Sequence, residues 1–257
     1  HIPYDHATYM DASPEDKCEN VRREICLTLE RMGIWPESSH HEQGPGQNEI
    51  DFRYSDALSA ADNAMTFRTV VKTIAASNGL CADFSPKPLA DQPGSGFHIN
   101  MSLKDSTVEQ MHHMMGGILH HVADMTRFLN PTAQSYHRLG LCKAPKYISW
   151  SNNNRSMLIR VPAAAGEYRR MELRSPDCTA NPYIAFALLI WAGLDGLNKA
   201  MVLPEKANVN LYTAGPKDIS DMETLPLSLN SAMKRAESSE FIRTHLPQTL
   251  IEYFCKH

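Results

Sequence analysis

Apolar side chains recur at two different periods along this chain, one typical of amphipathic helices and one typical of half-buried strands. The helical period predicts helices over roughly 14–33, 57–78, 107–128 and 182–200. In the first of these helices, Ser13 would be the N-cap, Pro14 would occupy the first helical position, and Gly33 would end the helix. The segment from Leu203 onward is interrupted by prolines, which predicts one or two short helices.

The strand period is clearest in residues 97–104. Phe97, Ile99, Met101 and Leu103 would point to one face, and the polar residues between them would point to the other. We expect further strands near 146–151, 156–161 and 169–174. Because strands and helices follow each other without regular alternation, the pattern predicts an α+β fold rather than a doubly wound sheet. One domain spanning 1–257 fits this order best.

Composition and charge exclude several classes of protein. The chain is 42% hydrophobic and 21% charged with a formal net charge of −4, so nucleic acid and anionic membranes are not expected partners. The longest apolar run, 184–194, is shorter than the about 20 residues that a bilayer requires. Six cysteines without a C-x-x-C pair argue against the usual zinc sites and favour reduced thiols. Because the start also lacks a signal-peptide pattern, we expect a cytoplasmic protein.

Carboxylates flank a glycine-proline-glycine turn in the stretch HHEQGPGQNEIDF, residues 40–52. Glu42 and Glu49 lie on either side of this break, so a hairpin would return both side chains to one place. The stretch is then either half of a divalent-metal site or a charged loop, with His40 and His41 as supporting residues.

A second polar group lies on predicted strands. Arg170, Glu172 and Arg174 alternate along one strand, which would form either a surface ion-pair ladder or the wall of an anion site. Taken alone, the ladder is favoured. His98 occupies the polar face of the 97–104 strand, next to a Gly94-Ser95-Gly96 segment that would let a ligand approach the backbone. With Glu42, Glu49 and Glu172, His98 would complete an oxygen-rich set suited to Mg²⁺ or Mn²⁺.

Two histidine pairs, at 112–113 and 120–121, lie on the third predicted helix. The pairs are two turns apart, too far for one ion. We interpret them as partly buried or solvated histidines.

Five motifs together resemble the catalytic domain of bacterial-type glutamine synthetase. They are ESSHHEQGPGQNEIDF (37–52), KPLADQPGSGFHINMS (87–102), NPTAQSYHRLG (130–140), APKYISWSNNNRSMLIRVP (144–162) and RRMELRSPDCTANPYIAFALLIWAGLDG (169–196). They follow the family's order and spacing over nearly the whole chain. The resemblance implies a curved, mostly antiparallel sheet with flanking helices. It also implies an ATP-dependent ligase that joins glutamate and ammonia through γ-glutamyl phosphate, forming homo-oligomers in its full-length form.

The resemblance also implies roles for individual residues. Glu42 and Glu49 would hold the Mg²⁺ or Mn²⁺ ion nearer glutamate, and His98 and Glu172 the ion that bridges the ATP phosphates. Gly94 would lie along the glutamate. Substrate binding would further involve Arg138, Arg155 and Arg174, of which Arg155 and Arg174 would also be catalytic. The nucleotide site would be lined by Glu37, Asn100, Ser102, Arg155 and Arg160.

The chain departs from the family in three ways. It contains no Glu-x-Glu, the pattern of an upstream strand that supplies further metal carboxylates, and it lacks the family's small N-terminal domain. Lys143 stands where the family's flap has a glutamate that receives a proton from ammonia, and a cation there would repel ammonium. A gentler change beside these three is Glu167, near the position where the family often has a lysine for the nucleotide phosphates.

These departures leave three hypotheses. The first is a glutamine synthetase-like catalytic domain that is incomplete in isolation, and we rank it first. The second is a non-catalytic homologue with a binding or regulatory role. The third is a γ-glutamyl ligase that uses another amine.

Overall fold

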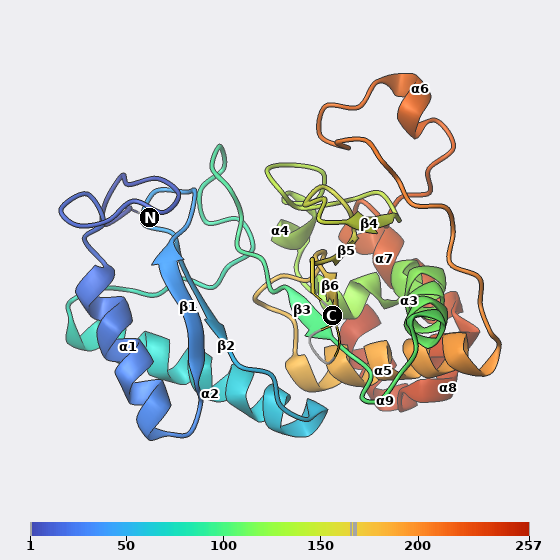
Figure 1. Cartoon of the computed structure of the whole chain (residues 1–257), viewed down its shortest axis with the longest axis horizontal. Coiled ribbons are helices and arrows are strands. Elements are labelled where there is room, and N and C mark those ends of the chain that lie inside the picture. The colour runs from blue at the N-terminus through green and yellow to red at the C-terminus, as the bar shows by residue number, and fades with distance from the viewer. Residues whose placement is uncertain (1, 165, 167–168, 257) are drawn as a thin grey trace. The chain divides into compact units, whose positions relative to one another are not determined.

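The computed structural model describes residues 2–164, 166 and 169–256, and its chain divides into two compact units (Figure 1). Unit 1 comprises His1–Phe84 and Pro88–Gly94, and unit 2 comprises Ser85–Lys87 and Ser95–His257. Each unit has its own hydrophobic core. The single domain expected from the sequence stays a prediction.

Unit 1 is built from two helices and a two-stranded antiparallel sheet. Its elements are α1 (Glu19–Arg31), β1 (Pro36–His41), β2 (Asn48–Phe52) and α2 (Ala57–Ser77). Apolar residues of both helices and of the segment between α1 and β1 form its core: Ile25, Leu29, Ile34, Val70 and Ile74. The helical period of the sequence therefore located both helices correctly.

The predicted start of the first helix at Ser13 is wrong. The helix begins at Glu19, and Cys18 is its N-cap residue without a side-chain cap bond. The carboxylate of Asp16 accepts a hydrogen bond from the Cys18 N–H and binds the Arg22 guanidinium, so this buried ion pair fixes the chain just before the helix. A long-range contact therefore decides where the helix begins, although the local capping signal at Ser13 suggested otherwise.

Unit 2 places helices around a four-stranded mixed sheet. The strands are β3 (Ile99–Met101), β4 (Trp150–Asn152), β5 (Ile159–Val161) and β6 (Met171–Leu173), in the order β3-β6-β5-β4. The β3–β6 and β6–β5 pairs are antiparallel and β4–β5 is parallel. The predicted strands exist but are shorter than the sequence pattern suggested. Together with the helices they confirm the α+β class.

Two long helices, α3 (Val108–Leu129) and α5 (Pro182–Asn198), pack against each other in the main core. Thr107 and Gln110 form a capping box at the start of α3, and Asn181 caps α5 with Pro182 in its first turn. The helices approach so closely that a Cβ atom on Gly117 would lie 2.1 Å from the Ala192 carbonyl oxygen. The predicted boundaries of these helices are confirmed to within a few residues.

The C-terminal part of unit 2 is more helical than predicted. Beside α4 (Ala133–Tyr136), the described residues contain α6 (Pro216–Ile219), α7 (Leu229–Ser238), α8 (Glu240–His245) and α9 (Gln248–Lys256). Prolines lie between α6 and α7 and between α8 and α9, while Ser239 separates α7 from α8, so the interruptions divide the segment into short helices rather than preventing them. Within the described part of the chain, none of the helices has the length and apolarity needed to cross a membrane.

The histidine pairs on α3 are partly buried and partly solvated: His120 is exposed, and the other three contact residues of unit 2. His121 is buried and its Nε2 lies 2.8 Å from Asp195 Oδ2, while His113 Nδ1 lies 3.0 Å from the Met201 carbonyl oxygen. The His112 ring packs near Trp150. These contacts explain the histidines through the packing of unit 2.

Candidate active site

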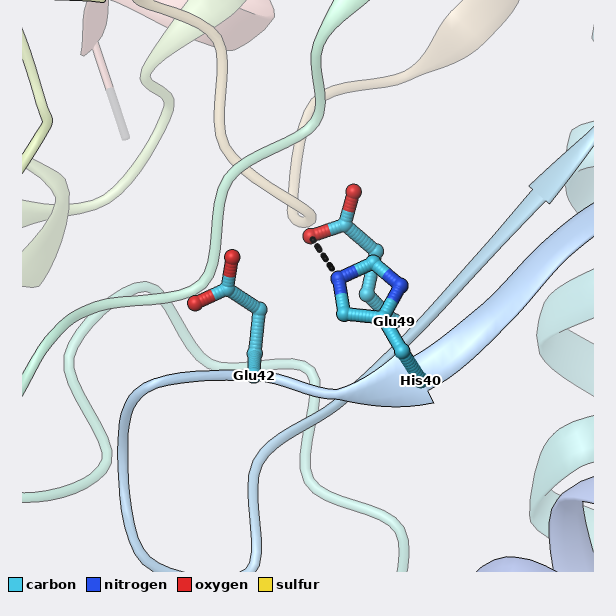
Figure 2. A group of neighbouring side chains, drawn as sticks. All are labelled: His40, Glu42 and Glu49. Atoms are coloured by element: carbon cyan, nitrogen blue, oxygen red, sulfur yellow. Dashed lines mark ion pairs between the residues drawn. The ribbon is translucent and has the colours of Figure 1, made fainter. Parts of the chain in front are cut away.

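The hairpin of unit 1 brings two predicted metal ligands together. His40 pairs directly with Glu49 across the two strands, and Glu42 follows His40 by two residues. Because side chains alternate along a strand, all three point to the same face of the hairpin (Figure 2). One ligand atom from each lies within 4.8 Å of the other two. His40 Nε2 is 3.8 Å from Glu49 Oε2.

The turn that joins the strands is held by its own backbone. The Glu42 N–H donates to the Gln47 carbonyl and the Gln47 N–H donates to the Gly44 carbonyl. Gly46 has a φ of +61°, a left-handed conformation that favours glycine. The sequence prediction of a hairpin turn that returns both carboxylates to one place is therefore confirmed.

The ligand atoms of this hairpin fit a hard divalent cation. Two carboxylates and one imidazole within a few ångströms form a mixed oxygen and nitrogen donor set, which Mg²⁺ and Mn²⁺ accept. His40 therefore belongs to the candidate ligands, while His41 points to the opposite face and is fully buried. The sequence interpretation treated both histidines as support, and the structure separates their positions.

The second predicted group surrounds Glu172 on the central strand β6 of unit 2. Glu172 pairs with Asn100 of β3 on one side and with Arg160 of β5 on the other. Its oxygens accept hydrogen bonds from Arg160 at 2.8 Å and from Arg174 at 2.7 Å, and His98 Nδ1 lies 3.2 Å away. The sheet thus collects one carboxylate, two guanidiniums and one imidazole.

The charges around Glu172 determine its protonation. Burial alone would raise the pKa of Glu172, but the hydrogen bond and charge of His98, together with Arg174 and Arg160, lower it to about 2. Desolvation lowers the pKa of His98, which Glu172 partly opposes and Arg174 reinforces. A carboxylate and a neutral imidazole are the protonation states that bind metal. Arg174 and His98 both contact Oε1 of Glu172, whereas Oε2 accepts from Arg160 and has a second lone pair with which it could act as a ligand.

The second guanidinium beside Glu172 is not the one that the sequence pattern suggested. Arg170 is exposed and donates from Nε to Asn100 Oδ1, whereas Arg160 reaches Glu172 from the neighbouring strand. The surface ladder of alternating charges along one strand is therefore wrong, because Glu172 is buried and one of its guanidinium partners comes from the neighbouring strand.

Arg174 and Arg138 are both buried in unit 2. Arg174 donates to Glu172 and, through Nε, to the Arg155 carbonyl. Arg138 donates to the carbonyls of Ser175 and Pro176, each at 2.9 Å, and desolvation lowers its pKa. A Cβ on Gly96 would lie 2.9 Å from His98 Nε2 and 3.5 Å from a terminal nitrogen of Arg138. Only glycine at position 96 leaves room for both side chains.

The remaining predicted site residues occupy varied places. In unit 1, Glu37 is exposed on β1 at an irregularity of the strand pairing, and the Gly94 carbonyl accepts a hydrogen bond from Gln47. In unit 2, Ser102 is exposed just after β3, and Lys143 has a φ of +71°. Glu167 lies outside the described residues.

Comparisons with known proteins identify the family of this chain. A family model described as "Glutamine synthetase, catalytic domain" matches residues 1–257. The chain belongs to the glutamine synthetase family. The glutamine synthetase of Methanosarcina mazei is 41% identical over 267 residues, and that of Staphylococcus aureus is 42% identical. Both matches cover 97% of this chain but 60% of the relative, so the chain spans less than two thirds of these glutamine synthetases.

Solved structures agree on the fold. The chain is similar to a structure named "GmaS/ADP complex-Conformation 1", with a TM-score of 0.87 and 30% identity over 99% of this chain and 63% of that one. A second, named "Apo GmaS without ligand", has a TM-score of 0.85 and 31% identity. The glutamine synthetase-like fold predicted from the motifs is thereby confirmed, whereas the roles of individual site residues stay predictions.

Sequence reasoning missed several residues around the hairpin. His40 had a usable signal, since it lies two residues from Glu42 on a predicted strand. Asp5 had none, because its contact with His41 joins residues 36 positions apart. Contacts of that range cannot be deduced from local pattern in one sequence.

Proposed function

We propose that this chain is the catalytic part of an ATP-dependent glutamate–ammonia ligase that works through γ-glutamyl phosphate. The observation that carries the proposal is the grouping of His40, Glu42 and Glu49 on one face of the hairpin, in a glutamine synthetase catalytic domain. Phosphoryl transfer to a carboxylate brings several anions together, so it requires concentrated positive charge. This grouping is suited to hold a divalent ion for that purpose.

Bound Mg²⁺ or Mn²⁺ would supply charge neutralisation for the phosphates and the substrate carboxylate. Glu42 and Glu49 would hold one ion, with His40 as a further donor, and His98 and Glu172 would hold the other. The low pKa of Glu172 keeps this carboxylate ionised over the whole physiological range. Its ligand charge would therefore not depend on pH there.

Arginines would bind the anions directly. Arg174 is fixed by Glu172 and by the Arg155 carbonyl, so its guanidinium is preorganised to face a transferring phosphate. Arg155 would assist it, and Arg138 would orient the glutamate carboxylate, with Gly94 along the substrate. Arg138 donates from one terminal nitrogen to the Ser175 carbonyl and from the other to the carbonyls of Pro176 and, at 3.5 Å, Arg174, while a guanidinium carries five N–H hydrogens in all.

ATP would bind against Glu37, Asn100, Ser102, Arg155 and Arg160. One of the similar solved structures is named as an ADP complex, which supports a nucleotide site in this fold. The glutamine synthetase relatives support glutamate and ammonia as the other substrates. Because the relatives are longer than this chain, residues outside it would complete the coordination of both metal ions. The full-length protein would form homo-oligomers. Six free cysteines favour the reducing cytoplasm.

One observation favours a second candidate, a γ-glutamyl ligase for another amine. Lys143 occupies the flap position that carries a glutamate in the family. A lysine there would disfavour ammonium and would leave deprotonation of the amine to another group. The two candidates share every step up to the acyl phosphate, so the amine alone distinguishes them.

Phosphate release from ATP tests the proposal. The assay would contain the chain with the residues that precede it, glutamate and Mg²⁺, and either ammonium or a panel of primary amines. Native protein should release phosphate in proportion to the amine added, and Arg174→Lys should lower the maximal rate. Metal binding without glutamate-dependent phosphate release under any amine would contradict the ligase and support a non-catalytic binding role.

A further inference from the structure

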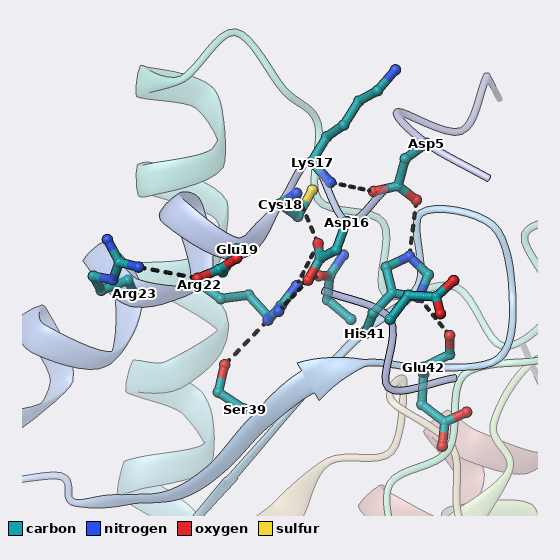
Figure 3. Close-up of polar contacts among 12 residues, drawn as sticks. Asp5, Asp16, Lys17, Cys18, Glu19, Arg22, Arg23, Ser39, His41 and Glu42 are labelled. Carbon is teal, nitrogen blue, oxygen red and sulfur yellow. Dashed lines mark hydrogen bonds and ion pairs between the residues drawn. The ribbon is translucent and has the colours of Figure 1, made fainter. Parts of the chain in front are cut away.

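The side of the hairpin opposite the candidate metal ligands holds a buried polar contact that the proposed chemistry does not use. His41 points away from Glu42 and Glu49 and is 0% exposed, while Asp5, in the segment before α1, is 2% exposed. His41 Nε2 lies 2.8 Å from Asp5 Oδ1, and His41 Nδ1 lies 2.6 Å from the Glu42 carbonyl oxygen (Figure 3). Both ring nitrogens therefore have an oxygen partner.

Asp5 contacts the turn at two places. Its Oδ1 accepts hydrogen bonds from His41 and from the Gly46 N–H at 3.0 Å, and its Oδ2 accepts one from the Lys17 N–H at 3.1 Å. Residues 41 and 46 lie at opposite ends of the turn. One carboxylate thus connects both ends and ties them to the segment that leads into α1.

This arrangement fixes the backbone of Glu42 from both sides. Its N–H donates to the Gln47 carbonyl, and its carbonyl oxygen is held by His41. The Glu42 side chain is held as well, because its Oε2 accepts a hydrogen bond from the Gln43 N–H at 2.6 Å. Restricting a ligand before binding lowers the entropic cost of the complex.

Gly46 permits the close approach of the N-terminal segment. A Cβ there would lie 3.3 Å from the Tyr4 backbone nitrogen, and the residue already has a positive φ. The glycine of the turn therefore has a second function beside its conformation, which is to let Asp5 reach the turn.

We propose that Asp5 and His41 are positioning residues that hold Glu42 in its metal-binding geometry. Neither touches the ion or the substrate, because both lie on the opposite face of the hairpin. The inference rests on the proposed function for its metal, and on the contacts above for its geometry. Hydrogen bonds that orient metal ligands typically change metal affinity by about 10–100-fold when they are removed.

Mn²⁺ binding to the chain, followed by the electron paramagnetic resonance of free Mn²⁺, tests the proposal. Asp5→Ala removes the charge and every acceptor, whereas Asp5→Asn removes the charge but keeps Oδ1 as an acceptor for His41 and Gly46. We expect Asp5→Ala to weaken Mn²⁺ binding by about 10–100-fold and Asp5→Asn to remain close to native. His41→Phe, which fills the space without donors, should weaken binding as Asp5→Ala does.

Asp11→Asn is the matched control. It removes one negative charge from the same exposed segment, where Asp11 accepts hydrogen bonds only from Thr8 in the contacts described for its side chain. It should leave Mn²⁺ binding unchanged. If Asp5→Asn weakens binding as much as Asp5→Ala, the carboxylate acts through its charge and the positioning proposal is wrong.

A second measurement needs no metal. Amide hydrogen exchange should accelerate at Glu42 and Gln47 in Asp5→Ala, because these amides depend on a fixed turn, and it should be unchanged at Val70 in α2. Unchanged exchange at Glu42 overturns the proposal whatever the metal does. If the native protein and Glu49→Gln bind Mn²⁺ equally weakly, the proposed metal site is wrong. The exchange measurement alone then tests whether Asp5 and His41 fix the backbone of Glu42. If Asp5→Ala does not fold, His41→Phe takes its place in both measurements, with Asp5→Asn as the variant expected to remain close to native.

Discussion

Replacing Gly117 with alanine should strongly destabilise unit 2. Among the glycines of α3 and α5, only Gly196 should be as sensitive to this substitution. The new Cβ would lie 2.1 Å from the Ala192 carbonyl oxygen and 2.6 Å from the Gly196 nitrogen. An alanine at Gly196 would meet the His113 carbonyl oxygen at 2.1 Å. Because these partners are backbone atoms of helices, they cannot rotate away as a side chain would.

The expected loss of stability follows from how far the two helices must move apart to relieve these close contacts. Favourable contacts of this kind lie near about 3.5 Å, so the helices must separate by roughly 1 Å or more at the crossing. Overpacking of a core costs about 1–3 kcal/mol and more where nothing can yield, while alanine gains about 1 kcal/mol over glycine in a helix. We expect a net loss of about 2 kcal/mol or more, a large part of the about 5–15 kcal/mol that stabilises a typical domain.

Urea unfolding followed by circular dichroism measures this loss. Gly193→Ala is the control, since its Cβ would meet only the Met114 side chain, at 2.8 Å from Cγ, and methionine adapts easily. It should cost about 1 kcal/mol or less. The double variant of Gly117 and Gly196 should cost less than the sum, because one separation of the helices relieves both contacts. Equal free energies of unfolding for Gly117→Ala and Gly193→Ala would refute the reasoning.

Three further predictions concern charge and the site. Burial alone would raise the pKa of Asp16, but its contacts, with the hydrogen bond and charge of Arg22 foremost, lower it overall. The ion pair therefore stabilises the folded state fully above the unfolded carboxyl pKa of about 3.9. This stabilisation is lost as the pH falls through the lower pKa of the folded state. Asp16→Asn should therefore cost about 3 kcal/mol at pH 7 and flatten the acid end of the stability profile, and an unchanged profile would count against the pair. Gly96→Ala should displace His98 and weaken divalent-metal binding in unit 2 with little loss of overall stability, as calorimetry of binding and unfolding would show. Lys143→Glu in the full-length protein should raise ammonium-dependent turnover, and an unchanged rate would show that this residue does not face the amine.

The sequence predicted most of what depends on neighbours along the chain. Helical and strand periods located α2, α3, α5 and the strands, and the glycine-proline-glycine turn predicted the hairpin, because these features arise from local sterics and one-sided burial. The start of α1 was missed because Asp16 and Arg22 form a buried pair that outweighs a local cap.

The candidate site was predictable to the extent that it follows strand alternation. That rule predicted one face for Glu172 and Arg174, and the glycine-proline-glycine turn predicted that Glu42 and Glu49 would meet. Neither could show that Arg160 reaches Glu172, since the neighbour of a strand in a sheet is set by topology and not by spacing. Individual roles came from the resemblance, which carries information that one chain's periodicity lacks.

The direct pairing of His40 with Glu49 has a consequence for how this gene can change over evolutionary time. A slip of the two strands by one residue would preserve an antiparallel ladder yet turn Glu49 to the face of His41. A slip by two would keep the face but carry Glu49 about 7 Å along the strand, away from its partners. If the proposed metal site is used, insertions and deletions between positions 42 and 49 should be selected against in related genes. Related genes that do not use such a site should accumulate them freely, so the length of this short interval would report whether the site is retained.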